Sequence, residues 1–299
     1  MKNTILGLLA FSASAYSATI LAGNYGAGSI EQYSITGTDL GAFVAAGSGG
    51  LSAPGGFSVG PDGNLYVASR GTGSILEYNG TSGAFIGTFS TPTGEGTPYD
   101  IMFGSNGNAY VSSQDGFYIL NGTTGAVLSG ITGGTGSGNY GEAFRPSNGD
   151  FLLSEFGGGI IEYTLSGVLV GTYGTVTSGA DNVGLAVGAD GRVYSANQNN
   201  GTIGVIPLAG GAESNFATNF SAPEYLALFG GNLYFTDYFG SKVYALDGSG
   251  NVVSSFSTSF SPYGMAILGA SAAVPEPGSL SLLGAGLALC GLLGRRALR

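Results

Sequence analysis

The 299-residue sequence predicts an all-β fold, a six-bladed β-propeller, from three observations. Five similar segments align on glycines spaced 44, 42, 42 and 40 residues apart, at Gly63, Gly107, Gly149, Gly191 and Gly231. Each period holds four short strand-like segments separated by glycine-rich turns, which is typical of propeller blades. Helical periodicity is absent outside the two ends of the chain.

Each repeat predicts two β-hairpins. The first turn is a pair such as Asp62-Gly63, which accepts the positive φ angle of a tight hairpin. An outer pair of strands follows, for example residues 74–78 and 84–89, joined by a second glycine-rich turn. Five such units run from about residue 54 to residue 258.

A composite blade is expected to close the ring. The strand at residues 263–268 begins a sixth unit, but no hairpin partner follows it. Suitable partners stand at the other end, at residues 19–22, 29–33 and 41–44. One C-terminal strand plus three N-terminal strands would complete the sixth blade, giving a propeller domain at residues 19–268. A seven-bladed ring would need a repeat that the sequence lacks.

The N-terminus predicts export. Lys2 precedes an apolar stretch at residues 5–11, and small residues follow up to Ala18. This pattern is typical of a secretory signal peptide at residues 1–18, cut by signal peptidase after Ala15 or Ser17.

The C-terminus has three parts after a linker at residues 269–273. Pro275, Glu276 and Pro277 precede an apolar run at residues 280–293, and Arg295 and Arg296 follow it. Residues 274–299 thus resemble the PEP-CTERM sorting signal. The resemblance implies processing by an exosortase in an exopolysaccharide-producing Gram-negative bacterium, and delivery to the cell surface or extracellular matrix.

The physics of this tail fits a transient membrane association. A helix of 16 residues spans about 24 Å, whereas a stable transmembrane helix needs about 20 apolar residues. The basic residues at its end favour the cytoplasmic side. A permanent tail anchor is the alternative.

The propeller repeat also resembles a known group. The unit at residues 54–69, with Pro61-Asp62-Gly63-Asn64 in its turn, resembles the NHL-repeat, gluconolactonase-like and streptogramin-lyase-like propellers. These families include binding scaffolds, hydrolases and lyases, so the fold does not settle the function. The sequence contains no histidine, so no residue inherits the role of a histidine base.

Composition excludes several function classes. The only cysteine, Cys290, lies in the tail, so the sequence offers neither a cysteine nucleophile in the propeller nor soft zinc ligands. No catalytic constellation or phosphate loop is recognisable. Four basic residues remain in the propeller against 17 acidic ones, which disfavours nucleic acid as a partner.

Five acidic residues are expected at one mouth of the central channel. They lie where inner strands begin or where the next strands end: Asp100, Glu142, Glu155, Glu224 and Asp237. Carboxylate oxygens of this kind suit calcium. The alternative is that they are solvated rim residues. Counting strands places residue 268 at the opposite face.

Three functions stay open at this stage. The first is an extracellular binding or structural module, a monomer associated with exopolysaccharide. The second is a metal-dependent lactonase or ester hydrolase that uses the acidic mouth. The third is a carbohydrate-binding protein, because the 17 tyrosines can stack on sugar rings.

Overall fold

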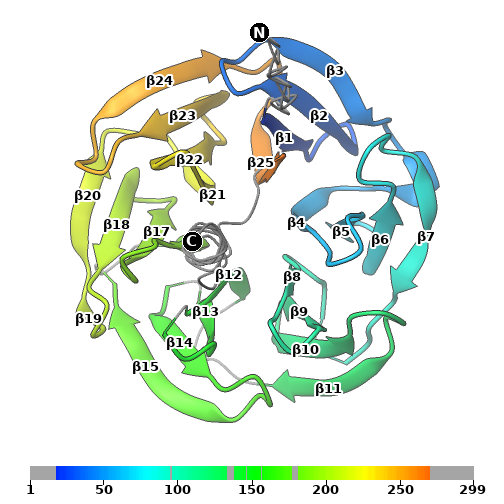
Figure 1. Ribbon diagram of the computed structural model, residues 1–299, viewed down its shortest axis with the longest axis horizontal. Coiled ribbons are helices and arrows are strands. Elements are labelled where there is room, and N and C mark those ends of the chain that lie inside the picture. Colours follow the sequence, from blue (N-terminus) through cyan, green and yellow to red (C-terminus); the bar gives the residue numbers. More distant parts are fainter. Residues whose placement is uncertain are drawn as a thin grey trace, which may run out of the picture. The chain divides into compact units, whose positions relative to one another are not determined.

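A computed structural model describes residues 18–269, apart from residues 95, 133–137, 146, 156 and 177–180. In this part of the chain, six sheets surround a common axis as the blades of a β-propeller (Figure 1). Each blade has four antiparallel strands. The predicted six-bladed, all-β fold is therefore confirmed.

The first three blades follow one another along the chain. From the channel outward, blade 1 is β4 (Pro54–Val59), β5 (Leu65–Ser69), β6 (Ser74–Tyr78) and β7 (Phe85–Ser90). Blade 2 is β8 (Met102–Phe103), β9 (Asn108–Ser113), β10 (Gly116–Asn121) and β11 (Val127–Thr132). Blade 3 is β12 (Asn139–Phe144), β13 (Phe151–Glu155), β14 (Ile160–Tyr163) and β15 (Leu169–Thr175).

The last three blades complete the ring. Blade 4 is β16 (Asn182–Val187), β17 (Val193–Asn197), β18 (Thr202–Ile206) and β20 (Ser214–Thr218). Blade 5 is β21 (Pro223–Phe229), β22 (Asn232–Asp237), β23 (Lys242–Leu246) and β24 (Val252–Ser257). Blade 6 is β25 (Pro262–Leu268), β1 (Thr19–Asn24), β2 (Ser29–Ser34) and β3 (Asp39–Val44).

Blade 6 closes the ring in the predicted way. Its inner strand β25 pairs with β1, with Thr19 opposite Leu268 and Ile20 opposite Ile267. Ile20 is fully buried, so the closing strand is part of the core. One feature was not predicted: β19 (Gly211–Ala212), in the loop before β20, pairs in parallel with β15 and links blades 3 and 4.

The hairpin turns have the backbone that their glycines predict. Gly63, Gly107, Gly149 and Gly191 have φ angles of 84°, 78°, 77° and 78°. Residues with a Cβ seldom adopt this left-handed region, which explains the glycine in each turn. A 3₁₀ turn, η1 (Ser48–Gly50), precedes blade 1.

Aromatic side chains hold neighbouring blades together. Tyr66 of β5 packs edge-on against Phe89 and Phe103, with ring centroids 4.7 Å and 4.8 Å away. Phe103 belongs to blade 2, so this cluster joins two blades. Tyr110 takes the same place in blade 2, and Phe144 and Phe151 of blade 3 lie 5.1 Å from it. The recurrent tyrosine of the repeat is thus a core residue.

The predicted targeting segments fall outside the described residues. These are residues 1–17 of the signal peptide and the whole sorting signal at 274–299. Across the part of the chain that is described, no helix has the length and apolar character needed to cross a membrane.

Candidate functional site

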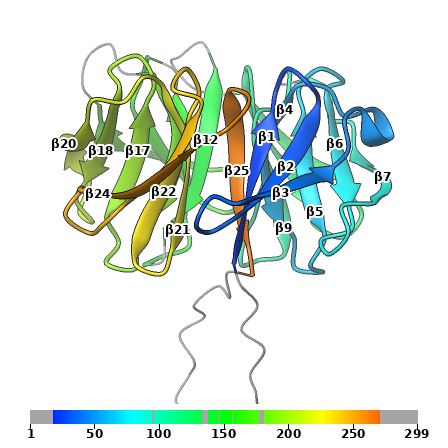
Figure 2. The ribbon, with the colours of Figure 1, turned by 90° about the horizontal axis from the view of Figure 1, so that it is seen from above.

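The inner strands all begin at one face of the ring, here called the mouth face. In blade 6, Pro262 at the start of β25 lies opposite Asn24, whereas Leu268 at its end lies opposite Thr19. Figure 2 shows β25 crossing the ring from one face to the other. The expected separation of the strand starts from residue 268 is confirmed.

Each inner segment carries one extra residue at the mouth face. In blade 5, Pro223 lies opposite Asp237 and Leu226 opposite Phe235, so three steps along β21 match two along β22. The same shift occurs in the other five blades. Such a bulge redirects side chains locally. The first residue after the opening pair is Gly55, Tyr99, Tyr140, Val183, Glu224 and Tyr263 in blades 1 to 6. That residue is called here the first bulge residue, and the one after it the second bulge residue.

The second bulge residues of the six blades close the channel beneath the mouth. Four of the six are glycines, and a Cβ at Gly56 or Gly184 would collide with the neighbouring blade. The other two are Asp100 and Tyr225. Tyr225 reaches from blade 5 to the opposite blade, where its hydroxyl donates to the carbonyl oxygen of Tyr99 over 3.1 Å. Because Tyr225 is buried, it forms a floor rather than an open pore.

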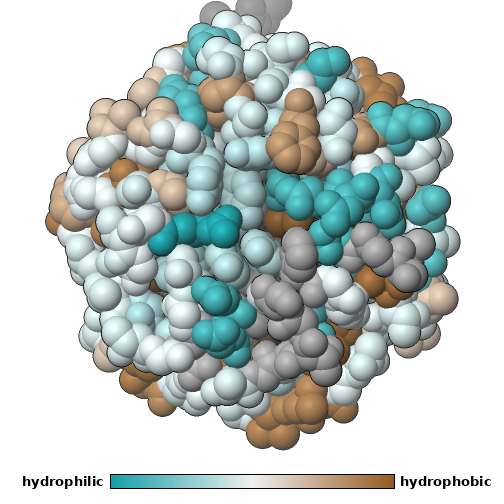
Figure 3. All heavy atoms as spheres, turned by 180° about the vertical axis from the view of Figure 1, so that it is seen from behind, coloured by the Kyte–Doolittle hydropathy of each residue, from teal (hydrophilic) through white to brown (hydrophobic). Residues whose placement is uncertain are grey.

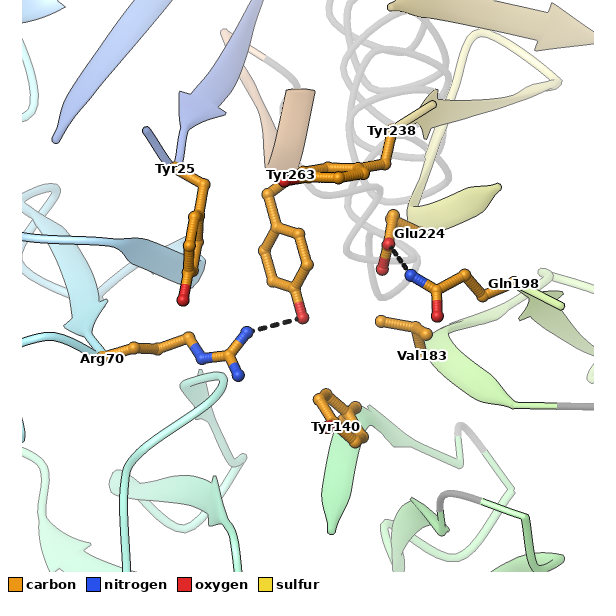
Figure 4. A pocket seen from close by; sticks show the side chains of 8 residues that line it. All are labelled: Tyr25, Arg70, Tyr140, Val183, Gln198, Glu224, Tyr238 and Tyr263. Carbon is orange, nitrogen blue, oxygen red and sulfur yellow. Dashed lines mark hydrogen bonds between the residues drawn. The ribbon is translucent and has the colours of Figure 1, made fainter. Parts of the chain in front are cut away.

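Above this floor lies a cup of about 280 Å³, called here the Arg70 cup. Four of its lining residues are first bulge residues, and the other four come directly after the second strand of a blade (Figure 4). The lining residues are Tyr25, Arg70, Tyr140, Val183, Gln198, Glu224, Tyr238 and Tyr263. On the space-filling view of this face, hydrophilic side chains surround the centre and the larger hydrophobic patches lie toward the rim (Figure 3).

Arg70 is held by aromatic rings. Its guanidinium carbon lies 4.3 Å from the ring centroid of Tyr99 and 5.3 Å from that of Tyr263. One terminal nitrogen donates to the Tyr263 hydroxyl over 2.8 Å. Cation–π contacts of this kind fix the group without neutralising it. Figure 4 shows the guanidinium pointing into the cup.

Glu224 faces Arg70 across the cup (Figure 4). Its Oε1 accepts a hydrogen bond from the Gln198 amide, and its buried Oε2 has no protein partner. Burial raises the pKa of Glu224 to about 8, although the Gln198 bond and the charge of Arg70 act in the opposite direction. The carboxyl group is therefore mainly protonated at neutral pH, and can donate as well as accept a hydrogen bond.

Two further acids lie buried at the inner strands of blades 2 and 3. Burial raises the pKa of Asp100 to about 8, against a hydrogen bond from the Ile101 backbone N–H. Burial, and next the charge of Asp100, raise the pKa of Glu142 well above its ordinary value. Glu142 accepts a hydrogen bond from the Ser112 backbone N–H. Neither residue lines the cup.

The remaining two predicted acids contact the loops next to their own strands. Asp237 accepts hydrogen bonds from the backbone N–H groups of Ser221, Ala222 and Gly240, at 3.0, 2.8 and 3.1 Å. Glu155 holds the equivalent place in blade 3 and lies against the turn at Gly158. Both acids are buried, at the ends of their strands rather than on a solvated rim.

The five acids therefore share a face but not a single site. Within the described ranges, no group of three or more His, Cys, Asp or Glu residues could hold a metal ion. Of the five, only Glu224 lines the cup. Calcium binding stays a prediction that titration can test.

Of the residues that line the cup, sequence reasoning placed only Glu224 and Tyr263 at the mouth. Tyr140 and Val183, at the same strand position as these two, were missed. Tyr25, Arg70, Gln198 and Tyr238 each come directly after the second strand of a blade. Aligning the repeats at that strand end would have placed them in one ring. Three tyrosines at the starts of inner strands, Tyr99, Tyr225 and Tyr263, lie around the cup or beneath it.

Comparisons with known proteins support the fold. No family model and no curated protein matches the sequence. A chain of the nidogen/laminin complex superposes with a TM-score of 0.68 at 17% identity, covering 84% of this chain and 98% of that one. A streptogramin B lyase gives 0.59 at 19% identity, covering 71% and 72%.

A third similar structure is virginiamycin B lyase from Staphylococcus aureus, with a TM-score of 0.63 at 15% identity, covering 82% of this chain and 84% of that one. At these identities the likeness establishes the propeller architecture that the NHL-like and streptogramin-lyase-like structures share.

The side chains of the cup are suited to binding and orienting a ligand. Burial raises the pKa of Tyr263 well above its ordinary value, so its phenol stays protonated and is a poor base. The chain has no histidine. What the cup supplies is one cation, one uncharged acid and several flat aromatic faces.

Proposed function

We propose that the protein is an exported binding module of the extracellular matrix, and that the Arg70 cup is its ligand site. The observation that supports this most is the cup itself, which places a half-buried cation among tyrosines on a closed floor. A concave site in which aromatic faces and a few polar groups converge is a typical place for a ligand to bind.

Binding is favoured over catalysis by the chemistry of the side chains. One similar structure is a catalytically inactive variant of virginiamycin B lyase, in complex with quinupristin, in which alanine replaces a histidine. Our chain has no histidine at any position. The hydrolase alternative needs a metal, and within the described residues no group of three metal-binding side chains is present.

Export and matrix association rest on the sequence. The signal peptide predicts passage through the inner membrane, and the sorting signal predicts processing by an exosortase. The ectodomain carries a strong negative charge and no disulfide, so it depends on its core for stability. An extracellular polysaccharide is the partner that this setting implies.

Co-sedimentation tests the proposal. Processed protein purified from its native culture is mixed with the polysaccharide of that culture and centrifuged. We expect the unmodified protein to sediment with the polymer. A double variant that carries both Tyr238→Ala and Tyr25→Ala should not. Phe85→Ala removes an aromatic ring from the outer strand β7 and is the control. Equal sedimentation of all three proteins would contradict a role for the cup.

Mass spectrometry of the same sample tests export. The mature chain should begin between residues 16 and 19 and should lack residues 295–299. A full-length intracellular product would rule out this part of the proposal.

A further inference from the structure

The cup has an uncompensated positive charge. Two other arginines of the described region are neutralised by carboxylates: Arg145 lies 2.5 Å from Glu162, and Arg192 lies 2.6 Å from Asp190. Arg70 has no ion pair among the described residues, although it is largely enclosed by tyrosines. Its buried Nε also lacks a hydrogen-bond partner.

The acid opposite Arg70 does not cancel this charge. Glu224 is fully buried, and its Oε1 is bonded to Gln198 rather than to Arg70. Because burial raises the pKa of Glu224 to about 8, the group is mainly neutral at pH 7. The cup therefore contains an arginine that no carboxylate of the described residues pairs with, and such a group favours an anion over a cation as ligand.

The walls of the cup favour a flat, hydroxylated ligand. Tyr99 and Tyr140 stack with centroids 4.4 Å apart and planes 10° apart, behind the guanidinium. On the other side, Tyr238 stands at 88° to Tyr263, with centroids 6.0 Å apart. Tyrosine offers an apolar face and a polar tip. A sugar ring has the matching form, with C–H faces and a rim of hydroxyl groups.

Size limits the ligand to about one ring. The volume of about 280 Å³ lies just below the range of about 300 to 1,000 Å³ that is usual for small-molecule pockets. Phe239 is 72% exposed and packs edge-on against Tyr238, 5.2 Å away. It provides an apolar surface beside the cup, where the next unit of a chain could lie.

We propose that the Arg70 cup selects a sugar ring bearing a carboxylate, that is, a hexuronic acid unit, and binds this carboxylate through the Arg70 guanidinium. The planar guanidinium matches a carboxylate in geometry as well as in charge. A neutral sugar would leave Arg70 without a counter-charge. This inference rests on the proposed function, since it names the ligand class of the same site.

Calorimetric titration of the processed protein tests the inference. The probes are D-galacturonate and D-glucuronate, each compared with its neutral sugar, D-galactose or D-glucose, at pH 6.5. We expect at least one of the acids to bind about tenfold more tightly than its neutral partner, and Arg70→Gln to remove this advantage. Arg192→Gln removes a partly exposed arginine outside the cup and should change nothing.

A pH series with Glu224→Gln sharpens the test. Ionisation of Glu224 would neutralise Arg70, so the affinity of the unmodified protein for the acid should fall as the pH rises from 6.5 to about 9. Glu224→Gln cannot ionise and should show a flat profile. The other ionisable groups that act on Glu224, or on which it acts, are Arg70, Asp237, Tyr140, Tyr225 and Tyr263.

The possible results separate the two proposals. Equal affinity for acidic and neutral sugars, both lost in Tyr238→Ala, would overturn the inference and leave the proposed function intact. Inorganic sulfate that competes as well as galacturonate would overturn it too, since the site would be a simple anion site. If circular dichroism shows that Arg70→Gln does not fold, the results for Tyr238→Ala and the pH series decide whether the inference holds. Absence of both sugar binding and co-sedimentation would end both proposals.

Discussion

The two faces of the ring differ in how strictly their residues repeat. At the face opposite the mouth, four blades use the same Asp-Gly or Asn-Gly turn, and the glycine φ angles agree within a few degrees. At the mouth face, the equivalent bulge position holds glycine, valine, glutamate or tyrosine. The one-residue shift recurs there in every blade, but the side chains differ.

This difference separates scaffold from site. A turn that needs a positive φ restricts the residue in every blade, so the same solution recurs. A bulge directs the side chain of its residue toward the cup, but it does not require a particular amino acid at that position. The positions where the repeat loses its regularity are therefore the ones that distinguish this propeller from others of its shape.

The largest expected effect comes from breaking the scaffold. Deleting residues 19–44 removes β1, β2 and β3 and leaves β25 unpaired in blade 6. Exposed sheet edges favour aggregation, so we expect loss of the cooperative melting transition and of the monomer in size-exclusion chromatography. A truncated protein that stays monomeric and melts like the full protein would show that the composite blade is not needed for closure.

Two acids at the mouth face should differ in how much stability is lost when they are substituted. Asp237→Ala leaves three backbone N–H groups without their acceptor, which should lower the free energy of unfolding by about 3 kcal/mol. For a domain of this size that is a fall of roughly 10 °C in Tm. Glu224→Gln resembles the protonated acid and should cost less than about 1 kcal/mol at pH 7.

Thermal melting of both variants checks this comparison. A structural role for Glu224 equal to that of Asp237 would give the two variants similar Tm values, and the division between loop acid and ligand-site acid would then be wrong.

Stability should fall as pH rises from about 5 to 8. The buried acids Asp100 and Glu224 have pKa values raised to about 8, and that of Glu142 is raised as well. Between the unfolded and folded pKa values, the folded state binds more protons than the unfolded state. Each such group therefore lowers the free energy of unfolding by about 1.4 kcal/mol per pH unit.

Above pH 8 the contributions of Asp100 and Glu224 should level off. Denaturant unfolding across this range measures the slope, and Glu224→Gln should make it shallower. A stability that rises steadily from pH 5 to 8 would contradict protonated acids at the mouth.

The smallest effect is expected from calcium. Asp237 is already bonded to three backbone donors, and Arg70 faces Glu224 across the cup. Because these acids already have partners, we expect millimolar calcium to shift Tm by less than about 2 °C. Such a shift corresponds to less than about 1 kcal/mol in the free energy of unfolding. A clear calcium-dependent rise that Glu224→Gln abolishes would restore the cation site that the sequence predicts.

The scaffold was predictable because its signals are local. A few neighbouring residues are enough to recognise the Gly63 turn and the strand at 263–268. The spacing of the repeats can be read directly along the sequence. Aligning the repeats could have placed Arg70 at the mouth, but not shown its role, since that depends on contacts with Tyr99 and Tyr263 in other blades. Asp237 was placed at the correct face, but sequence could not tell that backbone N–H groups already satisfy it.

The most direct test of the central claim is a crystal structure of the processed protein with galacturonate bound. The mouth face should carry the sugar, with its carboxylate within hydrogen-bonding distance of the Arg70 guanidinium and its ring between Tyr140 and Tyr238. An empty cup, with the sugar on the outer strands or at the Asp-Gly and Asn-Gly turns, would contradict the account.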